Sequence, residues 1–289
     1  MRRILPFVFA LLLGCAIHPT PPATEPPETA APTQAPTEAP IEADVIAVRE
    51  TDTPAPLPTL SPSPVPTPAP TPAPTQNPYR GEAATVSETN PGFWYCAPTE
   101  ALKARIIGTS FPENEKDCPV RMEDLRYVHL LYVDFDGEAH EGELLVHQTV
   151  VSDVMEIFEA LYDARWPLRS VRLVDDYGQP FSDELSMSAD NSSAFCCRRV
   201  TGETVFSRHS YGTAIDINPV ENPYLRKDGS FAPIESAPYL DRSDVRPGMI
   251  TGDDLCFRLF SEHGWKWGGN FTSEVDYQHF SKDVKGVTP

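Results

Sequence analysis

A change of composition near residue 80 limits what this chain can fold into more than any other feature. Residues 19–78 hold 19 of the chain's 32 prolines, and Thr, Ala and Glu fill most of the other positions. A segment with so few groups to bury cannot offset its ordering entropy, and dense proline favours extended polyproline II. We therefore expect residues 15–81 to form a disordered spacer and residues 82–289 to form the folded domain.

The N-terminus predicts export. Two arginines precede an apolar run at residues 4–13, which is typical of a signal sequence and too short to span a bilayer as a stable helix. Leu12-Leu13-Gly14-Cys15 resembles a bacterial lipobox, although an ordinary secretory signal with an incidental Cys is the alternative. We expect residues 1–14 to be removed and Cys15 to carry acyl chains, which can anchor a protein without a spanning helix. The protein would then lie on the outer face of a bacterial membrane, facing the cell wall.

The longest regular patterns of the folded domain lie near its middle. Residues 125–135 alternate and are rich in Tyr, Val and Leu, Asp136-Gly137 predicts a hairpin turn, and residues 138–147 form the returning strand. Apolar residues at helical spacing predict a helix at 151–161.

Shorter patterns complete the domain. Residues 214–218 predict a strand with Ala214, Asp216 and Asn218 on one face, and residues 253–263 predict a helix that Gly264 ends. Further strands are expected at 171–174, 265–267 and 277–280. The fold class is therefore α+β, an antiparallel sheet with flanking helices, in a single domain.

Charge and cysteine content exclude some functions. The net charge is −19 and no basic stripe is visible, so we expect no nucleic-acid partner. The six cysteines contain no C-x-x-C pair, which argues against a structural Cys zinc site. Cys96 and Cys118 could pair in an exported protein. We expect Cys196 and Cys197 to be buried as small apolar residues.

Two motifs near the C-terminus offer metal ligands. Residues 207–216 read S-R-H-S-Y-G-T-A-I-D, and residues 276–280 read D-Y-Q-H-F. His209, Asp216 and His279 supply two imidazoles and a carboxylate, a set that can hold a catalytic zinc with its fourth position open for water. Any one of them alone is more often a surface or capping residue, and the sequence H-E-x-x-H is absent.

Two nearby carboxylates could act as a general base. Asp276, three residues before His279, is placed to take a proton from a zinc-bound water. Glu274 is a rival whose spacing to His279 fits less well.

The pattern S-x-H-x-x-G-x-A-x-D, then Trp267-Gly268-Gly269, then D-x-x-H-F resembles the zinc D-Ala-D-Ala carboxypeptidase family. That family includes vancomycin-resistance D,D-peptidases and phage L-alanyl-D-glutamate endolysins. The resemblance covers about residues 125–283 and implies a hedgehog/DD-peptidase-like fold.

The resemblance also implies roles for single residues. His209, Asp216 and His279 would bind Zn²⁺, Asp276 would be the general base, and Arg198 would steady the polarised carbonyl. Arg199 is adjacent and could take the role of Arg198. We also expect Ser207 and Trp267 to contact the substrate, although a packed aromatic ring before a tight turn is an equal alternative for Trp267.

The predicted function is zinc-dependent hydrolysis of a peptidoglycan stem-peptide bond. An L-Ala–D-Glu endopeptidase is favoured, because Asp276 and the F-x-x-R segment Phe195-Cys196-Cys197-Arg198 resemble the endolysin-like branch. A D-Ala–D-Ala carboxypeptidase is a close second, and it would need a cationic group to hold the free carboxylate. The alternatives are a non-catalytic, zinc-containing cell-wall binding module on a Pro-rich stalk, and a surface adhesin.

Overall fold

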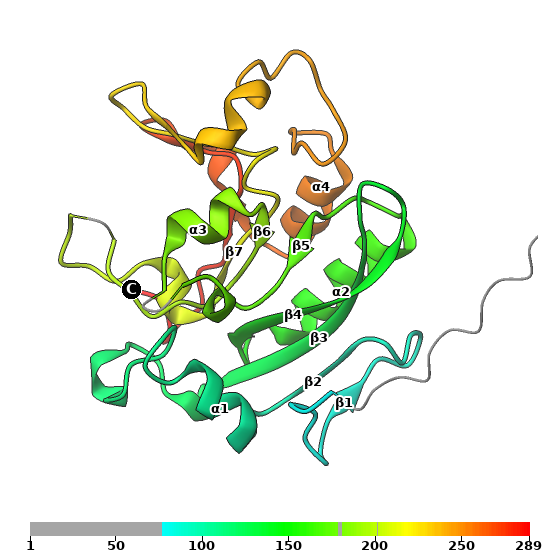
Figure 1. Cartoon of the computed structure of the whole chain (residues 1–289), viewed down its shortest axis with the longest axis vertical. Helices are drawn as coiled ribbons and strands as arrows, with labels where there is room; N and C mark the ends of the chain where they lie inside the picture. The colour runs from blue at the N-terminus through cyan, green and yellow to red at the C-terminus, as the bar shows by residue number, and fades with distance from the viewer. Residues whose placement is uncertain (1–76, 179–180, 201) are drawn as a thin grey trace, which may run out of the picture. The chain divides into compact units, whose positions relative to one another are not determined.

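The structure is a computed structural model that describes residues 77–178, 181–200 and 202–289 (Figure 1). All of these residues belong to one folded unit. The predicted signal sequence, the lipidation site Cys15 and the spacer up to residue 76 lie outside the described residues and stay predictions. Within the described part of the chain, no helix is long and apolar enough to cross a membrane.

A long β-hairpin forms the centre of this unit. Strand β3 (Leu125–Val133) pairs antiparallel with β4 (Ala139–His147), from Leu125 opposite His147 to Val133 opposite Ala139. In the turn, Asp134 Oδ1 accepts hydrogen bonds from the backbone N–H groups of residues 136 and 138, both at 2.9 Å. This cap ends β3 two residues earlier than the sequence predicts. The hairpin prediction is otherwise confirmed.

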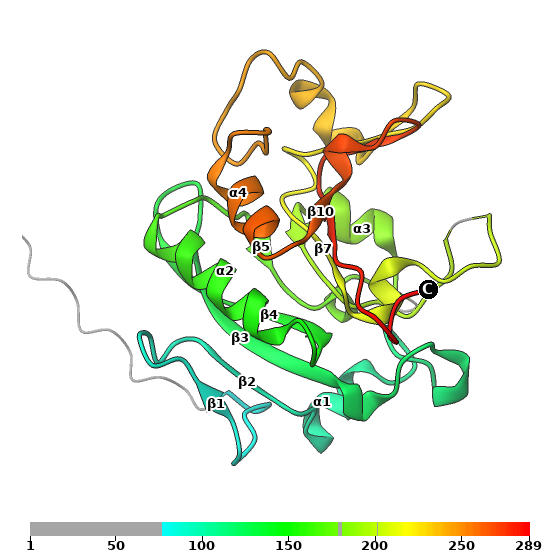
Figure 2. The same ribbon diagram turned by 180° about the vertical axis from the view of Figure 1, so that it is seen from behind.

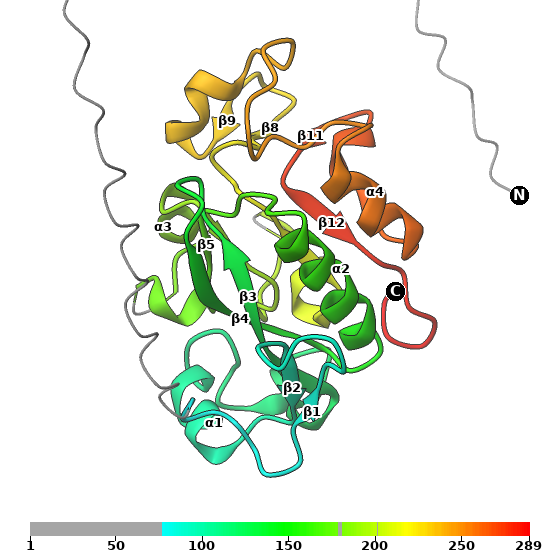
Figure 3. The same cartoon turned by 90° about the vertical axis from the view of Figure 1, so that its right-hand side faces the viewer.

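The two faces of the hairpin carry two separate hydrophobic cores. Helix α2 (Val151–Asp163) lies along one face, where Val154 and Phe158 pack with Val128 and Leu144 (Figures 2 and 3). Helix α1 (Glu100–Ile106) contributes to the core on the other face. Strands β1 (Thr85–Val86) and β2 (Trp94–Cys96) extend the sheet in the order β1-β2-β3-β4, with every pair antiparallel.

The C-terminal half is built from short elements. One sheet has the order β10-β12-β7 and another has the order β11-β8-β9, both antiparallel, while β5 and β6 form a parallel pair. The strands are β5 (Ser170–Val171), β6 (Asn191–Ser192), β7 (Ala214–Asp216), β8 (Tyr224–Leu225), β9 (Phe231–Ala232), β10 (Lys266–Trp267), β11 (Val275–Asp276) and β12 (His279–Ser281). The helices are α3 (Asp183–Ser188) and α4 (Leu255–Glu262), with 3-10 turns η1 (Glu115–Asp117), η2 (Met122–Asp124), η3 (Val174–Asp176), η4 (Arg208–Tyr211), η5 (Ile234–Tyr239) and η6 (Gly268–Asn270). The α+β class with antiparallel sheets is therefore confirmed.

Two strand predictions are wrong in extent. Strand β7 ends at Asp216, because Asn218 adopts a left-handed conformation with φ of 42°. The Asn218 side chain bonds instead to the backbone of residues 167 and 169, so Ala214, Asp216 and Asn218 do not share one strand face. The strand expected at 171–174 stops at Val171, and the 3-10 turn η3 follows.

The predicted pairing of Cys96 with Cys118 is also wrong. Cys118 forms a disulfide with Cys197, with a Cα–Cα distance of 5.9 Å. Cys96 lies in β2 with its side chain in the core beneath α1, where it is free and buried. Cys196 is buried as predicted, whereas Cys197 is the bonded partner rather than a buried thiol.

Candidate metal centre

The structure brings the three predicted ligands together. Antiparallel pairing of β12 with β7 sets His279 opposite Asp216, and η4 carries His209 beside them. His279 Nδ1 is 2.9 Å from Asp216 Oδ1, His209 Nε2 is 3.1 Å from Asp216 Oδ2, and the two imidazole nitrogens are 3.3 Å apart. Among the described residues, no other group of three or more His, Cys, Asp or Glu side chains is close enough to hold one metal ion.

The S-x-H-x-x-G part of the first motif shapes the backbone around His209. Ser207 is the N-cap of η4, and its Oγ accepts a hydrogen bond from His209 N at 3.3 Å. Gly212 ends the turn with φ of 65°, and a Cβ there would lie 2.6 Å from the backbone N of His147. Glycine is required because both the conformation and the close approach exclude a side chain. Ser207 is buried, so the contacts seen here are those of a capping residue.

The His209 imidazole is held in one orientation. Its Nδ1–H donates to the carbonyl oxygen of Ala194 at 2.5 Å, which leaves Nε2 facing Asp216 and His279. A backbone carbonyl in this position is the usual orienting partner of a metal-binding His. Asp216 is fixed as well, because its backbone N donates to Ser193 O at 2.9 Å.

The centre is built to hold positive charge. Burial disfavours ionisation of Asp216, but the charges and hydrogen bonds of His209 and His279 outweigh burial and hold its pKa well below the ordinary value. Burial likewise acts against a charged His209, yet Asp216 raises the His209 pKa. The negative charge of Asp216 therefore favours a proton on the neighbouring imidazole. A metal cation would compete with that proton for the same nitrogen.

Asp276 lies on β11, and the charges of both His279 and Asp216 act on it. Its Oδ1 is buried and has no hydrogen-bond partner among the described residues. Burial raises the pKa of Asp276 to about 7; the Asp216 charge adds to this rise and His279 opposes it. A carboxyl group that titrates near neutral pH is suited to general acid–base chemistry.

Gly268 of the W-G-G segment lies against the backbone of Asp276. A Cβ on Gly268 would lie 2.4 Å from Asp276 O, so only glycine allows this approach. Trp267 is 7 % exposed, its Nε1 donates to Tyr277 O at 2.8 Å, and its ring packs edge-on against Phe257. These are the contacts of a packed core residue. The predicted substrate contact of Trp267 stays a prediction.

Of the two neighbouring arginines, Arg198 is the one that acts on the centre. Its Nε forms an ion pair with Asp183 Oδ2 at 2.7 Å, and its charge acts on His209. Arg199 instead bonds to the carbonyl oxygen of Thr204 and lies over the Phe206 ring. Asp183, in the first turn of α3, was not predicted, because nothing in its sequence position links it to Arg198.

The alternative base Glu274 already has a hydrogen-bond partner. Its Oε2 accepts a hydrogen bond from Tyr224 OH at 2.6 Å, and β8 places Tyr224 opposite Asp276. Burial and the Glu274 carboxylate raise the pKa of Tyr224 to about 12. Tyr224 is a second neighbour that sequence spacing did not reveal.

Comparison with known families agrees with this geometry. Residues 201–282 match a family described as D-alanyl-D-alanine carboxypeptidase. The matched range contains His209, Asp216, Asp276 and His279 and leaves out Arg198. The predicted resemblance is confirmed over this range and supports a metallopeptidase. No curated protein and no solved structure matches the chain.

Proposed function

Because residues 201–282 match a family of zinc-dependent carboxypeptidases, we propose that this chain is a zinc metallopeptidase that hydrolyses a stem-peptide bond of peptidoglycan. The convergence of His209, Asp216 and His279 carries the proposal. Asp276 adds to it, since its buried Oδ1 has no hydrogen-bond partner among the described residues. We also propose that the domain has the hedgehog/DD-peptidase-like fold.

The donor set suits zinc. Two imidazoles and one carboxylate are three ligands, and catalytic zinc sites keep a fourth position open. His209 is already oriented by Ala194, so its Nε2 needs no rearrangement to bind an ion. When bound, zinc supplies Lewis acidity and lowers the pKa of water toward about 7.

The remaining roles fall to side chains of this chain. Asp276 accepts a proton from the attacking water and returns it to the leaving amine. Arg198 carries positive charge toward the carbonyl oxygen on which negative charge develops. Its ion pair with Asp183 involves Nε, and a guanidinium has further N–H groups to offer.

Between the two substrates, the endopeptidase is favoured. A terminal D-Ala carboxylate would need a cation, and Arg208, the arginine within the first motif, already pairs with Asp283 at 2.8 Å. Arg198 is assigned to the carbonyl oxygen of the cleaved bond instead. An internal L-Ala–D-Glu bond makes no such demand at the cleaved residue. The description of the matched family names the carboxypeptidase reaction, so D-Ala–D-Ala cleavage stays the second candidate.

A non-catalytic zinc module is the alternative. Such a module would need the three ligands but would have no use for Asp276, whose buried Oδ1 has no hydrogen-bond partner among the described residues. Buried polar groups without partners are rare and call for an explanation. This observation favours the enzyme.

We further propose that the protein is exported and anchored by lipid at Cys15, with residues 15–81 as a spacer that gives the domain reach toward the wall. The lipobox-like residues and the proline content support this. Replacing Cys15 with Ser should release the protein from the membrane fraction or leave it unprocessed.

Digestion of purified muropeptides, followed by product masses, tests the reaction. Release of L-Ala-linked sugar would identify the endopeptidase, and loss of one terminal D-Ala would identify the carboxypeptidase. If a chain that binds zinc gives no product at any zinc concentration, the non-catalytic binding module becomes the preferred function.

A further inference from the structure

Phe271 is a large apolar residue that lies at the surface beside the candidate metal centre. Its side chain is 43 % exposed, and its ring centroid lies 6.4 Å from that of His279, with the two ring planes inclined by 50°. Phe271 belongs to neither of the two hydrophobic cores, whereas Trp267 and Phe280 of the same region are buried. The exposed ring therefore lies against a proposed metal ligand without being needed to fill the core.

The backbone that carries Phe271 is fixed next to the proposed base. Phe271 is the C-cap of η6, and its N–H donates to Gly268 O at 3.0 Å. Gly268 approaches Asp276 so closely that a Cβ would lie 2.4 Å from Asp276 O, and a Cβ on Gly269 would lie 2.3 Å from the buried Trp267 ring. These close contacts hold the turn, and with it the exposed ring, at a set place beside the metal centre.

The neighbouring groups of the metal centre are charged or polar. Arg198 pairs with Asp183, and Glu274 accepts a hydrogen bond from Tyr224. The guanidinium of Arg226 lies over the Tyr224 ring, 5.1 Å from its centroid. The Phe271 ring differs from these groups because it is apolar and has no hydrogen-bonding atom. It would therefore favour an uncharged, apolar group of the substrate.

Both candidate bonds place an alanine at the metal centre. The residue that supplies the cleaved carbonyl is L-Ala in an L-Ala–D-Glu bond and the penultimate D-Ala in a D-Ala–D-Ala bond. That carbonyl has to lie at the metal centre for hydrolysis, so the methyl group of the same residue lies close to it. A charged side chain in this position would lose water to an aromatic ring without gaining a partner.

From these features we propose that Phe271 is a specificity-determining residue, whose ring contacts the methyl group of the alanine that supplies the cleaved carbonyl. The inference rests on the proposed peptidase function and adds to it the residue that selects the substrate. Loss of the ring should weaken substrate binding and leave zinc content unchanged, because Phe271 offers no ligand atom.

Calorimetric titration of the zinc-loaded Asp276→Asn chain tests the proposal, because this variant keeps the peptide intact. The probes are a muropeptide with a complete stem peptide and two analogues, in which glycine replaces either the L-Ala before D-Glu or the D-Ala before the terminal D-Ala. One of the two replacements should weaken binding about three- to fivefold, the value of one methyl group removed from water. Adding Phe271→Ala should weaken binding of the parent muropeptide by at least as much and should abolish the difference between alanine and glycine.

Two further variants separate substrate contact from a general effect on the fold. Ile107→Ala is the matched control, because Ile107 is 44 % exposed but belongs to the C-cap of α1 rather than to the turn beside His279. It should keep the preference for alanine. Phe271→Leu keeps an apolar side chain and should retain most of that preference. Zinc content is measured for every variant.

The replacement that matters also identifies the bond. A preference for L-Ala indicates the endopeptidase, and a preference for the penultimate D-Ala indicates the carboxypeptidase. The proposal is overturned if Phe271→Ala weakens all three probes equally, changes none of them or loses zinc, or if the Asp276→Asn chain binds no probe. Failure of the proposed function would look different, because the parent chain would cleave no muropeptide while the alanine preference and its dependence on Phe271 remained.

Discussion

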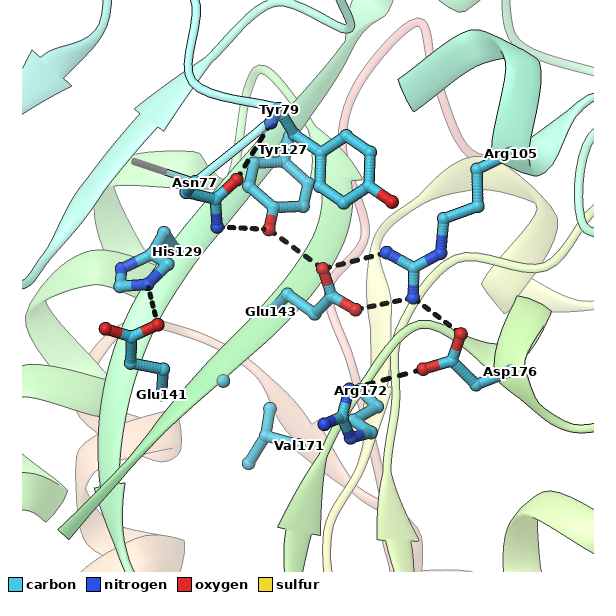
Figure 4. A pocket seen from close by; sticks show the side chains of 11 residues that line it. Asn77, Tyr79, Arg105, Tyr127, His129, Glu141, Glu143, Val171, Arg172 and Asp176 are labelled. Carbon is cyan, nitrogen blue, oxygen red and sulfur yellow. Dashed lines mark hydrogen bonds and ion pairs between the residues drawn. The ribbon is translucent and has the colours of Figure 1, made fainter. Parts of the chain in front are cut away.

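The metal centre and the Arg105–Glu143 network on the β3–β4 hairpin both contain charged side chains, but they differ in how many hydrogen-bond partners those side chains have. In the network, Glu143 receives two hydrogen bonds from Arg105 and a third from Tyr127 (Figure 4). At the metal centre, Asp276 has an Oδ1 with no partner among the described residues, and His209 and His279 crowd onto one carboxylate. The difference is one of completeness: Glu143 has a hydrogen-bond partner for each of its oxygens, whereas Asp276 Oδ1 has none among the described residues.

The strongest way to break this comparison is to remove one ligand. His209→Ala or His279→Ala should abolish stoichiometric zinc binding, because two remaining donors do not make a catalytic zinc site. Metal analysis of the purified variants checks this. His263→Ala is the control, since His263 pairs with Glu156 at the end of α4 and should leave zinc content unchanged. Full zinc occupancy in either ligand variant would show that the ligand assignment is wrong.

Asp276→Asn sharpens the comparison by keeping the ligands and removing the base. The amide has the same size but cannot accept the proton, so we expect zinc to bind and peptidase turnover to fall about 10²–10⁴-fold. Turnover on muropeptides, measured beside zinc content, checks this. Glu274→Gln is the control and should retain most activity, because Glu274 is engaged by Tyr224. An active Asp276→Asn with an inactive Glu274→Gln would transfer the role to Glu274.

We expect the loss of Arg105 from this network to lower the free energy of unfolding rather than peptidase turnover. Arg105→Met leaves the buried Glu143 without its guanidinium, and breaking such a pair costs about 3–5 kcal/mol. Denaturant unfolding measures the loss. Arg121→Met is the matched control, because the Arg121 side chain is 63 % exposed in its pairs with Glu123 and Asp124 and should contribute clearly less. Equal effects of the two variants would mean that the network is not a stabilising unit.

Asp175 is a buried carboxyl group next to Asp176, which belongs to the Arg105 network. Burial raises its pKa to about 6, although Ser110 N donates to it at 3.1 Å. Below pH 4 the group is protonated in both states and costs nothing. Between about pH 4 and 6 the unfolded chain releases the proton while the folded chain keeps it, so stability falls as pH rises, by at most about 3 kcal/mol.

Asp175→Asn should remove that fall, because the amide oxygen can still accept from Ser110 and carries no charge. Unfolding free energies of parent and variant across pH 4–7 check this. A parallel pH dependence in both would assign the effect to another carboxyl group.

Long periodic segments and local spacings were predictable from the sequence. The β3–β4 hairpin and α2 follow from alternation and helical spacing, and His209 and Asp216 belong to one short motif. The Arg198–Asp183 pair, the Tyr224–Glu274 pair and the Cys118–Cys197 bond were not predictable, because each joins stretches that only the tertiary fold brings together. The end of β7 was missed because Asn218 takes a left-handed conformation that alternation does not signal.

The disulfide also allows correct folding of the protein to be followed with a thiol reagent. Cys118 and Cys197 are 79 residues apart, and the loop that they close contains the hairpin, α2 and α3. Folding of those elements brings the two ends of the loop together. The other cysteines of the described residues, Cys96, Cys196 and Cys256, are buried. Apart from Cys15, a folded chain with this disulfide should therefore show no reactive thiol to a gentle alkylating reagent, and labelling would mark chains in which the bond has not formed or a buried cysteine has become exposed.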